Sequence, residues 1–520
     1  MPATSSLPGR EPKAGPEQVP GALVCLSAAF FCVTVLVFLI RAVSVLRGGQ
    51  FFTTSGGEYV SMYSVWREMK SLPLYTSPFN PPFNWSQYNY GFYACYAAFL
   101  NLLSPPDPKL MNCGRLLTVL FAALGVVAQW NLLRRLLSPA PGIAGIGPAD
   151  RPATPGWLLS LLCVSCWFNS SLVSWWAMSV RPDIPALALV FCGLSLVSCL
   201  DANGRWPDAV RWVAAALAFY LAWFFKQSSA ITFLVLVGCL AWSGRTRRRA
   251  VLLLSGFALC VVLTWLAGGP EYRASLSKAL GVGTWSIKEG ALVALREIAR
   301  NAYVFIPAFF VFQRHRGRHP LVRVLGGATV LSLAVAVVGI MKPGGAGNYL
   351  FEPYLAACTL VILLLLDPTL RPRKAVYCAI LLAAVAYPLI QVGAWALHIS
   401  TPWLLEHTAA ERADAHLLAR KLASAPKPAL APEMLSLPWF STDGQYPAYV
   451  LDPVLISAAE DAHLLAAGGI RGMIRRREFA SILTSQEDYY FDEPLRAGYI
   501  EQESFSAGGQ MLFLYIRPQR

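Results

Sequence analysis

The segment GALVCLSAAFFCVTVLVFLI, residues 21–40, is a run of twenty residues without a charged side chain. An α-helix needs about 20 consecutive apolar residues to cross the hydrocarbon core of a bilayer. The run follows a polar leader rich in Pro and Gly, is too long for a signal-peptide core, and lacks a clean small-residue cleavage site. We therefore predict a retained membrane anchor preceded by a leader over residues 1–20.

The whole chain has the composition of a polytopic membrane protein. Its 520 residues are 56% hydrophobic and only 14% charged, with a mean hydropathy of +0.48, whereas about a quarter of the residues in soluble domains are charged. Counting the anchor, the apolar runs predict about eleven spans. The others lie near residues 113–133, 157–177, 184–200, 209–225, 229–242, 250–267, 299–312, 321–341, 348–366 and 375–397.

The net charge of +14 lies mainly in short basic clusters between the apolar runs, which is the positive-inside pattern and not a nucleic-acid-binding surface. If the leader is cytoplasmic, every second connection is basic and also cytoplasmic, so the chain is predicted to be N-in and C-out. This holds only if residues 91–103, GFYACYAAFLNLL, form an interfacial or re-entrant helix and not a span. The basic connections are RRLLSPAPG, GRTRRRA, QRHRGRHPLVR and DPTLRPRKA.

Three parts of the chain follow from these patterns. Residues 21–398 form the transmembrane part, with a long first outer loop over residues 41–112. Residues 399–520 have a mixed composition that suits one small extracytoplasmic α/β domain. Within it, residues 407–428 predict a helix ended by prolines, and REFASILTS and QMLFLYIRP, residues 477–485 and 510–518, predict short strands.

Neither a disulfide framework nor a metal centre is indicated by the sequence. Most of the twelve cysteines lie inside apolar runs, and the close pair Cys163 and Cys166 has no histidine nearby in sequence. His315 and His319 have i, i+4 spacing but fall in a basic connection before Pro320. We therefore assign no cofactor; a divalent metal stays open but is not indicated.

Ionisable residues gather in the connections that this topology places outside. Such groups at membrane depth cost about 3 kcal/mol each, so several at one face indicate a shared polar cavity. The stretch GGEYVSMYSVW, residues 56–66, contains an acid just past the first span, and aromatic residues of the first loop are candidates for lining a sugar site. The candidate residues are Glu58, Tyr88, Tyr90, Arg181, Asp183, Lys226, Gln227, Lys342, Asn348, Tyr349 and Glu352.

This set of groups suits one kind of chemistry. A carboxylate at a lipid boundary can deprotonate a sugar hydroxyl, and cations can hold and stabilise a departing phosphate. That pairing is typical of glycosyl transfer from a polyprenyl-phosphate sugar. Because the leaving group is a phosphate monoester, side chains can stabilise it without an obligatory metal.

The same stretches resemble a family. GGEYVSMYSVWREMKSLPLYTSPFNPPF, YNYGFYACYAAFLNLL and GRLLTVLFAALG are similar to the amino-terminal half of GT-C membrane glycosyltransferases, in particular bacterial relatives of protein mannosyltransferases and of the lipid A aminoarabinose transferase. SVRPDIPALAL, FFKQSSAI, GNYLFEPYLA and REFASILTS continue the likeness in order along nearly the whole chain. The resemblance implies a cavity facing the periplasm of a bacterial inner membrane, interfacial helices in the first loop, and a polyprenyl-phosphate sugar donor.

The resemblance also implies residue roles. Glu58 matches the acidic position where the family's catalytic base is expected, and Asp183 matches a second acidic position. Many relatives have two adjacent acids in the first loop, whereas here Gly57 precedes Glu58. The predicted mechanism has Glu58 or Asp183 as the general base and Arg181, Lys226 and Lys342 on the lipid phosphate, with inversion in one displacement. The acceptor is a cell-envelope glycan, a lipid or a protein.

Other interpretations stay open at this point. In one alternative, Glu58 is an interfacial acid near Arg67 or Lys70. Arg181 and Asp183 are then a charge pair at the start of a helix. The Lys226 side chain then extends toward the membrane interface. A multi-span transporter is an alternative function, although internal repeats and broken midplane helices are not evident. A polysaccharide polymerase or ligase using a diphosphate-linked glycan is another.

Overall fold

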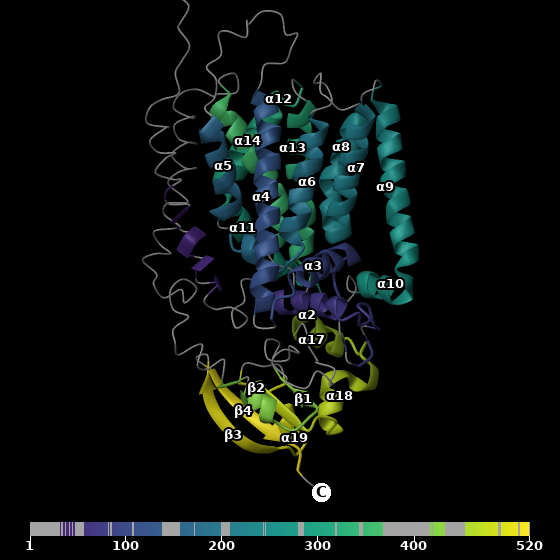
Figure 1. Ribbon diagram of the computed structural model, residues 1–520, viewed down its shortest axis with the longest axis vertical. Coiled ribbons are helices and arrows are strands. Elements are labelled where there is room, and N and C mark those ends of the chain that lie inside the picture. The colour runs from purple at the N-terminus through teal and green to yellow at the C-terminus, as the bar shows by residue number, and fades with distance from the viewer. Residues whose placement is uncertain are drawn as a thin grey trace, which may run out of the picture.

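A long helical bundle and a small sheet-containing unit make up the molecule (Figure 1). The computed structural model describes residues 57–137, 156–198, 208–367, 417–431 and 453–518, with short gaps inside these ranges, and isolated positions between 32 and 46. The leader, most of the predicted span at 21–40 and the whole predicted span at 375–397 lie outside the described residues.

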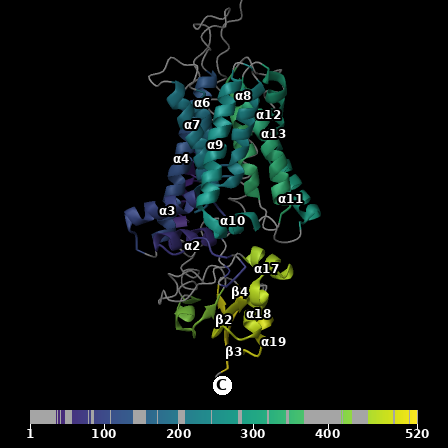
Figure 2. The same cartoon turned by 90° about the vertical axis from the view of Figure 1, so that its right-hand side faces the viewer.

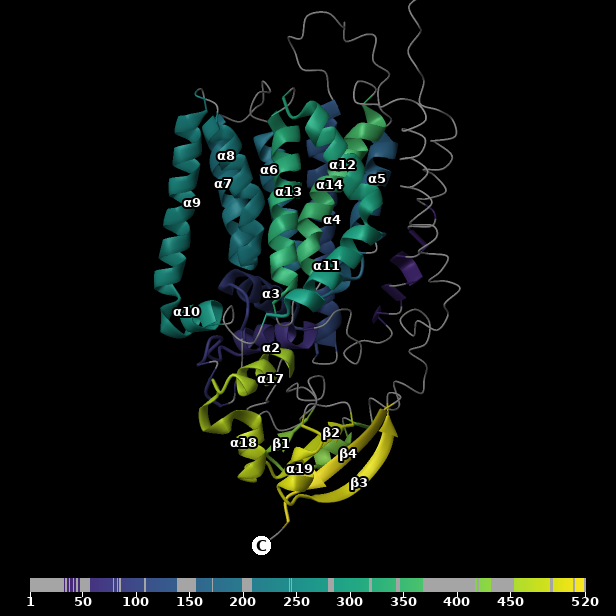
Figure 3. The same cartoon turned by 180° about the vertical axis from the view of Figure 1, so that it is seen from behind.

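Nine helices of the described residues run side by side along the long axis (Figures 1 and 3). Four are long and apolar enough to cross a membrane, when the last is counted together with the short helix η6 (Gly347–Leu350) that precedes it. The bundle is therefore polytopic as predicted, whereas the count of eleven spans stays a prediction. The helices are α4 (Leu110–Leu137), α5 (Gly156–Phe168), α6 (Asp183–Val197), α7 (Asp208–Phe225), α8 (Ile231–Trp242), α9 (Arg247–Ala267), α12 (Ala302–His315), α13 (Pro320–Ile340) and α14 (Phe351–Leu366).

The bundle core is apolar and centres on α14, which is buried along nearly all of its length. A helix that is hydrophobic on every face is stable only where other helices surround it, and α14 contacts α4, α5, α12 and α13. The predicted break in the apolar stretch 209–242 is confirmed, because Lys226 has an extended backbone between α7 and the short helix η5 (Gln227–Ala230).

Several shorter helices cover one end of the bundle. The first outer loop supplies α2 (Glu58–Met69) and α3 (Tyr90–Leu103), which lie across the bundle and not along it (Figures 1 and 2). This orientation agrees with the prediction that residues 91–103 do not cross. The connection between α9 and α12 contains α10 (Gly269–Lys278) and the amphipathic α11 (Ile287–Arg300), whose apolar residues recur at helical spacing.

The C-terminal unit lies beyond the same end of the bundle (Figure 1). Its four strands are β1 (Ala429–Leu430), β2 (Ser481–Ser485), β3 (Ile500–Ala507) and β4 (Gln510–Ile516), in the order β1-β2-β4-β3. β1 pairs with β2 in parallel, and the other pairs are antiparallel, with Leu483 opposite Leu514. Both predicted strands are present, and the described part of the predicted helix at 407–428 is helical up to residue 424.

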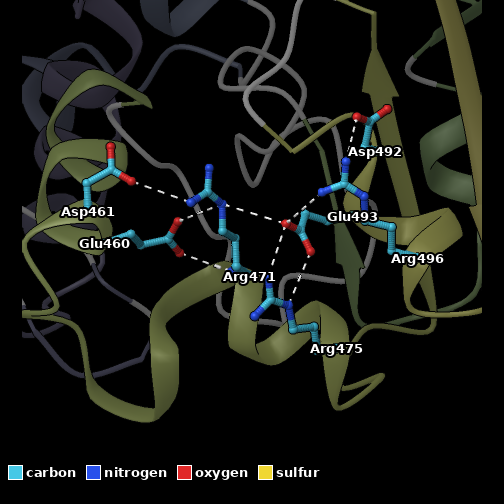
Figure 4. Close-up of polar contacts among 7 residues, drawn as sticks. All are labelled: Glu460, Asp461, Arg471, Arg475, Asp492, Glu493 and Arg496. Atoms are coloured by element: carbon cyan, nitrogen blue, oxygen red, sulfur yellow. Dashed lines mark hydrogen bonds and ion pairs between the residues drawn. The ribbon is translucent and has the colours of Figure 1, made fainter.

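Arginine–carboxylate contacts join the helices of this unit, α17 (Pro453–Asp461), α18 (Gly469–Arg475) and α19 (Glu493–Arg496) (Figure 4). Glu493 is buried and is approached by Arg475 at 3.3 Å and by Arg471 at 3.9 Å. Arg471 also lies 3.4 Å from Asp461, and its backbone N–H donates to Glu460. Burial raises the pKa of the Glu460 carboxyl above its ordinary value. The acids of this unit thus connect its helices, and two of them, Glu460 and Glu493, are buried.

The first outer loop contributes to the core of this unit. Phe83 is only 1% exposed and packs among the buried residues around Ile470, Phe479 and Tyr515. The backbone N–H of Ala466 donates to the carbonyl of Phe79 at 2.8 Å. The loop that follows α2 is therefore held on the C-terminal unit before it returns to the bundle at α3.

Candidate active site

The bundle end beneath α2 and α3 gathers most of the predicted site residues. The N-terminus of α2, the turn before α6, the break after α7 and the start of α14 meet there. Two buried carboxylates, Glu58 and Asp183, form the centres of two adjacent polar clusters, and Arg181 lies between them. The array expected from the outer connections is thus brought together for these segments.

Glu58 is fully buried at the first position of α2 and is held on several sides. Arg115 of α4 donates from Nε to Oε1 at 3.0 Å and from Nη2 to Oε2 at 2.8 Å. The backbone N–H of Val180 donates to Oε1 at 2.9 Å. This two-pronged ion pair stabilises the ionised carboxylate and occupies both of its oxygens.

Gly57 creates the room that Arg181 occupies beside this ion pair. Its φ is +74°, a left-handed conformation that a residue with a Cβ rarely adopts. A Cβ placed there would lie only 2.6 Å from Nη1 of Arg181. The glycine that departs from the family pattern thus permits both the backbone conformation and the close approach of the guanidinium.

Arg181 is positioned by aromatic rings. Its guanidinium lies 4.7 Å from the ring centroid of Trp176 and 5.6 Å from that of Tyr88, and Nη2 donates to the Tyr88 hydroxyl at 2.6 Å. Burial raises the pKa of the Tyr88 phenol above its ordinary value, so that the hydroxyl stays protonated at neutral pH. Arg181 therefore remains fixed between Glu58 and Asp183.

Asp183 begins α6, where the partial positive charge of the helix N-terminus favours an acid. Its Oδ1 accepts hydrogen bonds from the Lys226 ammonium and from Nδ2 of Asn348, the latter at 3.0 Å. Its Oδ2 lies 3.6 Å from Nε of Arg181 and accepts no hydrogen bond from any described residue. Among the described residues, Oδ1 of Asp183 thus accepts hydrogen bonds, whereas the buried Oδ2 lies beside Arg181 without one.

A small cavity of about 20 Å³ lies beside Asp183. It is lined by Asp183, Lys226, Ser229, Asn348, Tyr349 and Glu352, among others. The Lys226 ammonium lies 5.3 Å from the ring centroid of Tyr349, and Glu352 accepts hydrogen bonds from the backbone and hydroxyl of Thr232. Three of the predicted sequence segments, those that contain Asp183, Lys226 and Asn348, therefore meet at one cavity.

Three predicted residues lie apart both from this cavity and from the neighbouring cluster of Glu58, Arg181 and Tyr88. Gln227 turns to the first loop and donates to the carbonyl of Gln87 at 3.3 Å. Tyr90 is 41% exposed and donates to Glu68, which raises its pKa to about 12. Lys342 follows α13, where burial lowers its pKa, and it forms no ion pair with a described carboxylate. The glycine-rich turn at 343–346 lies outside the described residues.

Two functional candidates were missed from the sequence. Arg115 could have been found from the sequence, because it is the only charged residue in the first 24 positions of α4. A charge inside a membrane span indicates a buried partner. Trp176 gave no signal, since tryptophan is common near a membrane interface. Within the described ranges, no group of three or more His, Cys, Asp or Glu side chains has the geometry to hold a metal ion.

The comparisons with solved structures identify the fold. The chain superposes on ArnT from Cupriavidus metallidurans in the apo state with a TM-score of 0.52, and on the same protein bound to undecaprenyl phosphate with a TM-score of 0.56. Each superposition has 12% sequence identity and covers 96% of this chain and 98% of ArnT.

This chain has the ArnT fold. The architecture that the sequence predicted, a helical bundle followed by a small C-terminal unit, is therefore confirmed at the level of the fold. At 12% identity the likeness establishes the fold and not the substrate. No protein-family model matches the sequence, and no curated protein sequence matches it.

Proposed function

We propose that this protein is a membrane glycosyltransferase that moves a sugar from a polyprenyl-phosphate donor to an acceptor hydroxyl outside the cytoplasm. The main support is the buried Asp183, which is paired with Arg181 and Lys226 beside a cavity in an ArnT-like bundle and whose Oδ2 accepts no hydrogen bond from the described residues. The ArnT crystal structure with undecaprenyl phosphate supports a lipid phosphate as the common donor element.

In this proposal Asp183 is the general base and Glu58 is a positioning residue. Arg115 and Val180 already bind both oxygens of Glu58, so this carboxylate is a poor proton acceptor. Asp183 is also paired, but with the cations that would bind a phosphate. A donor phosphate that draws Arg181 and Lys226 toward itself would make the Asp183 carboxylate more basic, because it removes the opposite charges that stabilise the ionised form.

The proposed reaction is a single displacement with inversion. The acceptor oxygen attacks the anomeric carbon while its proton passes to Oδ2 of Asp183. The bond from the anomeric carbon to the phosphate oxygen breaks, and Lys226 and Arg181 stabilise the phosphate that leaves. We also propose that the protein lies in the bacterial inner membrane and that its C-terminal residues 399–520 lie on the periplasmic side.

Substitution of Asp183 tests the proposal. We expect Asp183→Asn to lower the rate of sugar transfer about 10²–10⁴-fold, the usual contribution of a positioned base, while the protein still inserts and binds polyprenyl phosphate. The measurement is transfer from a radiolabelled polyprenyl-phosphate sugar with the protein in nanodiscs. Normal transfer by a folded Asp183→Asn protein would exclude Asp183 as the base. Sugar flux into liposomes without transfer would favour the transporter alternative.

A further inference from the structure

A second groove lies at the bundle end opposite the C-terminal unit, away from Asp183. It is open, with a volume of about 470 Å³. One wall is the last turns of α8, with Val235, Gly238, Cys239 and Trp242, and the other is the α12–α13 connection. Residues 313–323 of this connection, QRHRGRHPLVR, belong to a basic segment that the sequence places on the cytoplasmic side.

Two arginines line the second groove. Arg323 donates from Nε to the carbonyl of Arg316 at 3.1 Å, so the two residues are held side by side. Neither guanidinium forms an ion pair with a carboxylate of the described residues. Two neighbouring arginines without an acidic partner attract an anion that both can contact.

The rest of the second groove is apolar and faces outward from the bundle. Trp242 is 87% exposed at the end of α8, the position of an interfacial aromatic residue. An added Cβ at Gly238 would meet nothing within 4 Å, whereas at Gly327, deeper along α13, it would contact Val235 at 2.9 Å. Helices α8 and α13 are therefore close together deeper in the bundle and further apart near its end. This leaves a slot beside Arg316 and Arg323.

We propose that this groove binds an anionic glycerophospholipid of the cytoplasmic leaflet. The phosphate lies on Arg316 and Arg323, and an acyl chain lies in the slot over Gly238. A charged headgroup joined to an apolar chain is the chemistry that satisfies both halves of the groove, because anionic lipids are attracted to cations near the cytoplasmic surface. The site is separate from the proposed transferase site and does not depend on that function.

Lipid retention by the full-length protein tests this proposal. The protein is purified from nanodiscs of equal parts phosphatidylglycerol and phosphatidylcholine, and the retained lipids are counted by native mass spectrometry. We expect the double variant Arg316→Gln/Arg323→Gln to reduce the preference for phosphatidylglycerol by at least about tenfold, given two lost cation contacts. Arg314→Gln, an exposed charge of the same segment that does not line the groove, is the control and should retain the preference.

A second variant tests the slot without changing charge. Gly238→Leu fills open space and is expected to displace the retained lipid, whereas Gly256→Leu on α9, which also meets open space, should not. Unchanged retention of phosphatidylglycerol in either the double arginine variant or Gly238→Leu would overturn the proposal. Equal loss in Gly256→Leu would also overturn it, because the effect would then not be specific to the groove.

Discussion

The two buried carboxylates of the site differ in how their charge is balanced. Glu58 has one dedicated arginine, whereas Asp183 shares its charge with two cations that border a cavity. Removing one partner of a buried ion pair costs about 3–5 kcal/mol, since it leaves an uncompensated charge, while replacing both partners is often neutral. Loss of activity in a single Glu58 variant would therefore not identify a base.

A double substitution separates the two roles of Glu58. We expect Glu58→Gln alone to destabilise the protein and to lower transfer, and Glu58→Gln/Arg115→Met to recover stability and most of the transfer, because the unpaired cation is gone. Thermal unfolding and transfer rate are measured on the same preparations. A double variant that is stable but inactive would contradict the proposal that Glu58 is only a positioning residue.

Gly57 is the residue at which backbone and site geometry are most tightly linked. Gly57→Ala is expected to lower the free energy of unfolding by about 1–3 kcal/mol through left-handed strain, and also to reduce transfer, because the new Cβ displaces Arg181. The control is Gly269→Ala, which has a similar φ of +78° but open space around its Cβ. An equal loss of transfer in both variants would show that strain alone, and not Arg181, is responsible.

At the scale of elements, the site depends on interruptions of otherwise apolar helices. Lys226 ends α7, and Asp183 begins α6 after a turn, so both charges project from helix ends where backbone groups are already unpaired. The first loop adds a further link, because the segment from Phe79 to Tyr88 contacts both the C-terminal unit and Arg181. This segment therefore links the C-terminal unit to Arg181 of the candidate active site.

Phe83 is the residue that tests this coupling. Phe83→Ala is expected to destabilise the C-terminal unit by about 3–5 kcal/mol, the usual cost of emptying a buried Phe site, and to lower transfer through the displaced first loop. Hydrogen exchange in β2 and β4, compared with α14, measures the local effect. Phe99→Ala on α3, which packs in a different cluster, should leave exchange in the sheet unchanged. Equal exchange in the sheet of the Phe83 and Phe99 variants would contradict the coupling.

At the scale of the whole molecule, the polar site and the arginine groove lie at opposite ends of the bundle (Figures 1 and 3). The ends of α4 and α12 and the start of α9, which carry the described basic residues of three connections, lie at the groove end, in agreement with the positive-inside rule (Figures 1 and 3). The N-in, C-out orientation is a prediction that this arrangement makes testable from two exposed positions.

Labelling with a membrane-impermeant thiol reagent measures the orientation. In a background without native cysteines, Ser506→Cys on β3 should react in intact cells, and Gly244→Cys, in the connection between α8 and α9, should react only after permeabilisation. Both positions are exposed, so accessibility and not burial decides the outcome. Labelling of both positions from one side, or in the reverse pattern, would contradict the predicted topology.

Local sequence predicted much of the fold and part of the site. The helices of the bundle, the break at Lys226 and the strands β2 and β4 follow from apolar length, an isolated charge and residue composition. The gathering of Glu58, Asp183 and Lys226 at one end follows from topology. Each of these features depends on residues that are neighbours along the chain, or on the predicted side of the membrane for each connection. Both can be read from the sequence without knowledge of the tertiary contacts.

Only the tertiary structure decided which charges neutralise each other. Arg115 pairs with Glu58, Arg181 occupies the space above Gly57, and Phe83 enters the core of a sheet some 400 positions further along the chain. The energy of a buried charge depends on the groups within a few ångströms of it, and those groups come from whichever helices happen to be adjacent. The amino-acid sequence therefore determined where the polar residues lie along the chain, while the packing of the helices determined that, among the described residues, both oxygens of Glu58 accept hydrogen bonds and Oδ2 of Asp183 accepts none.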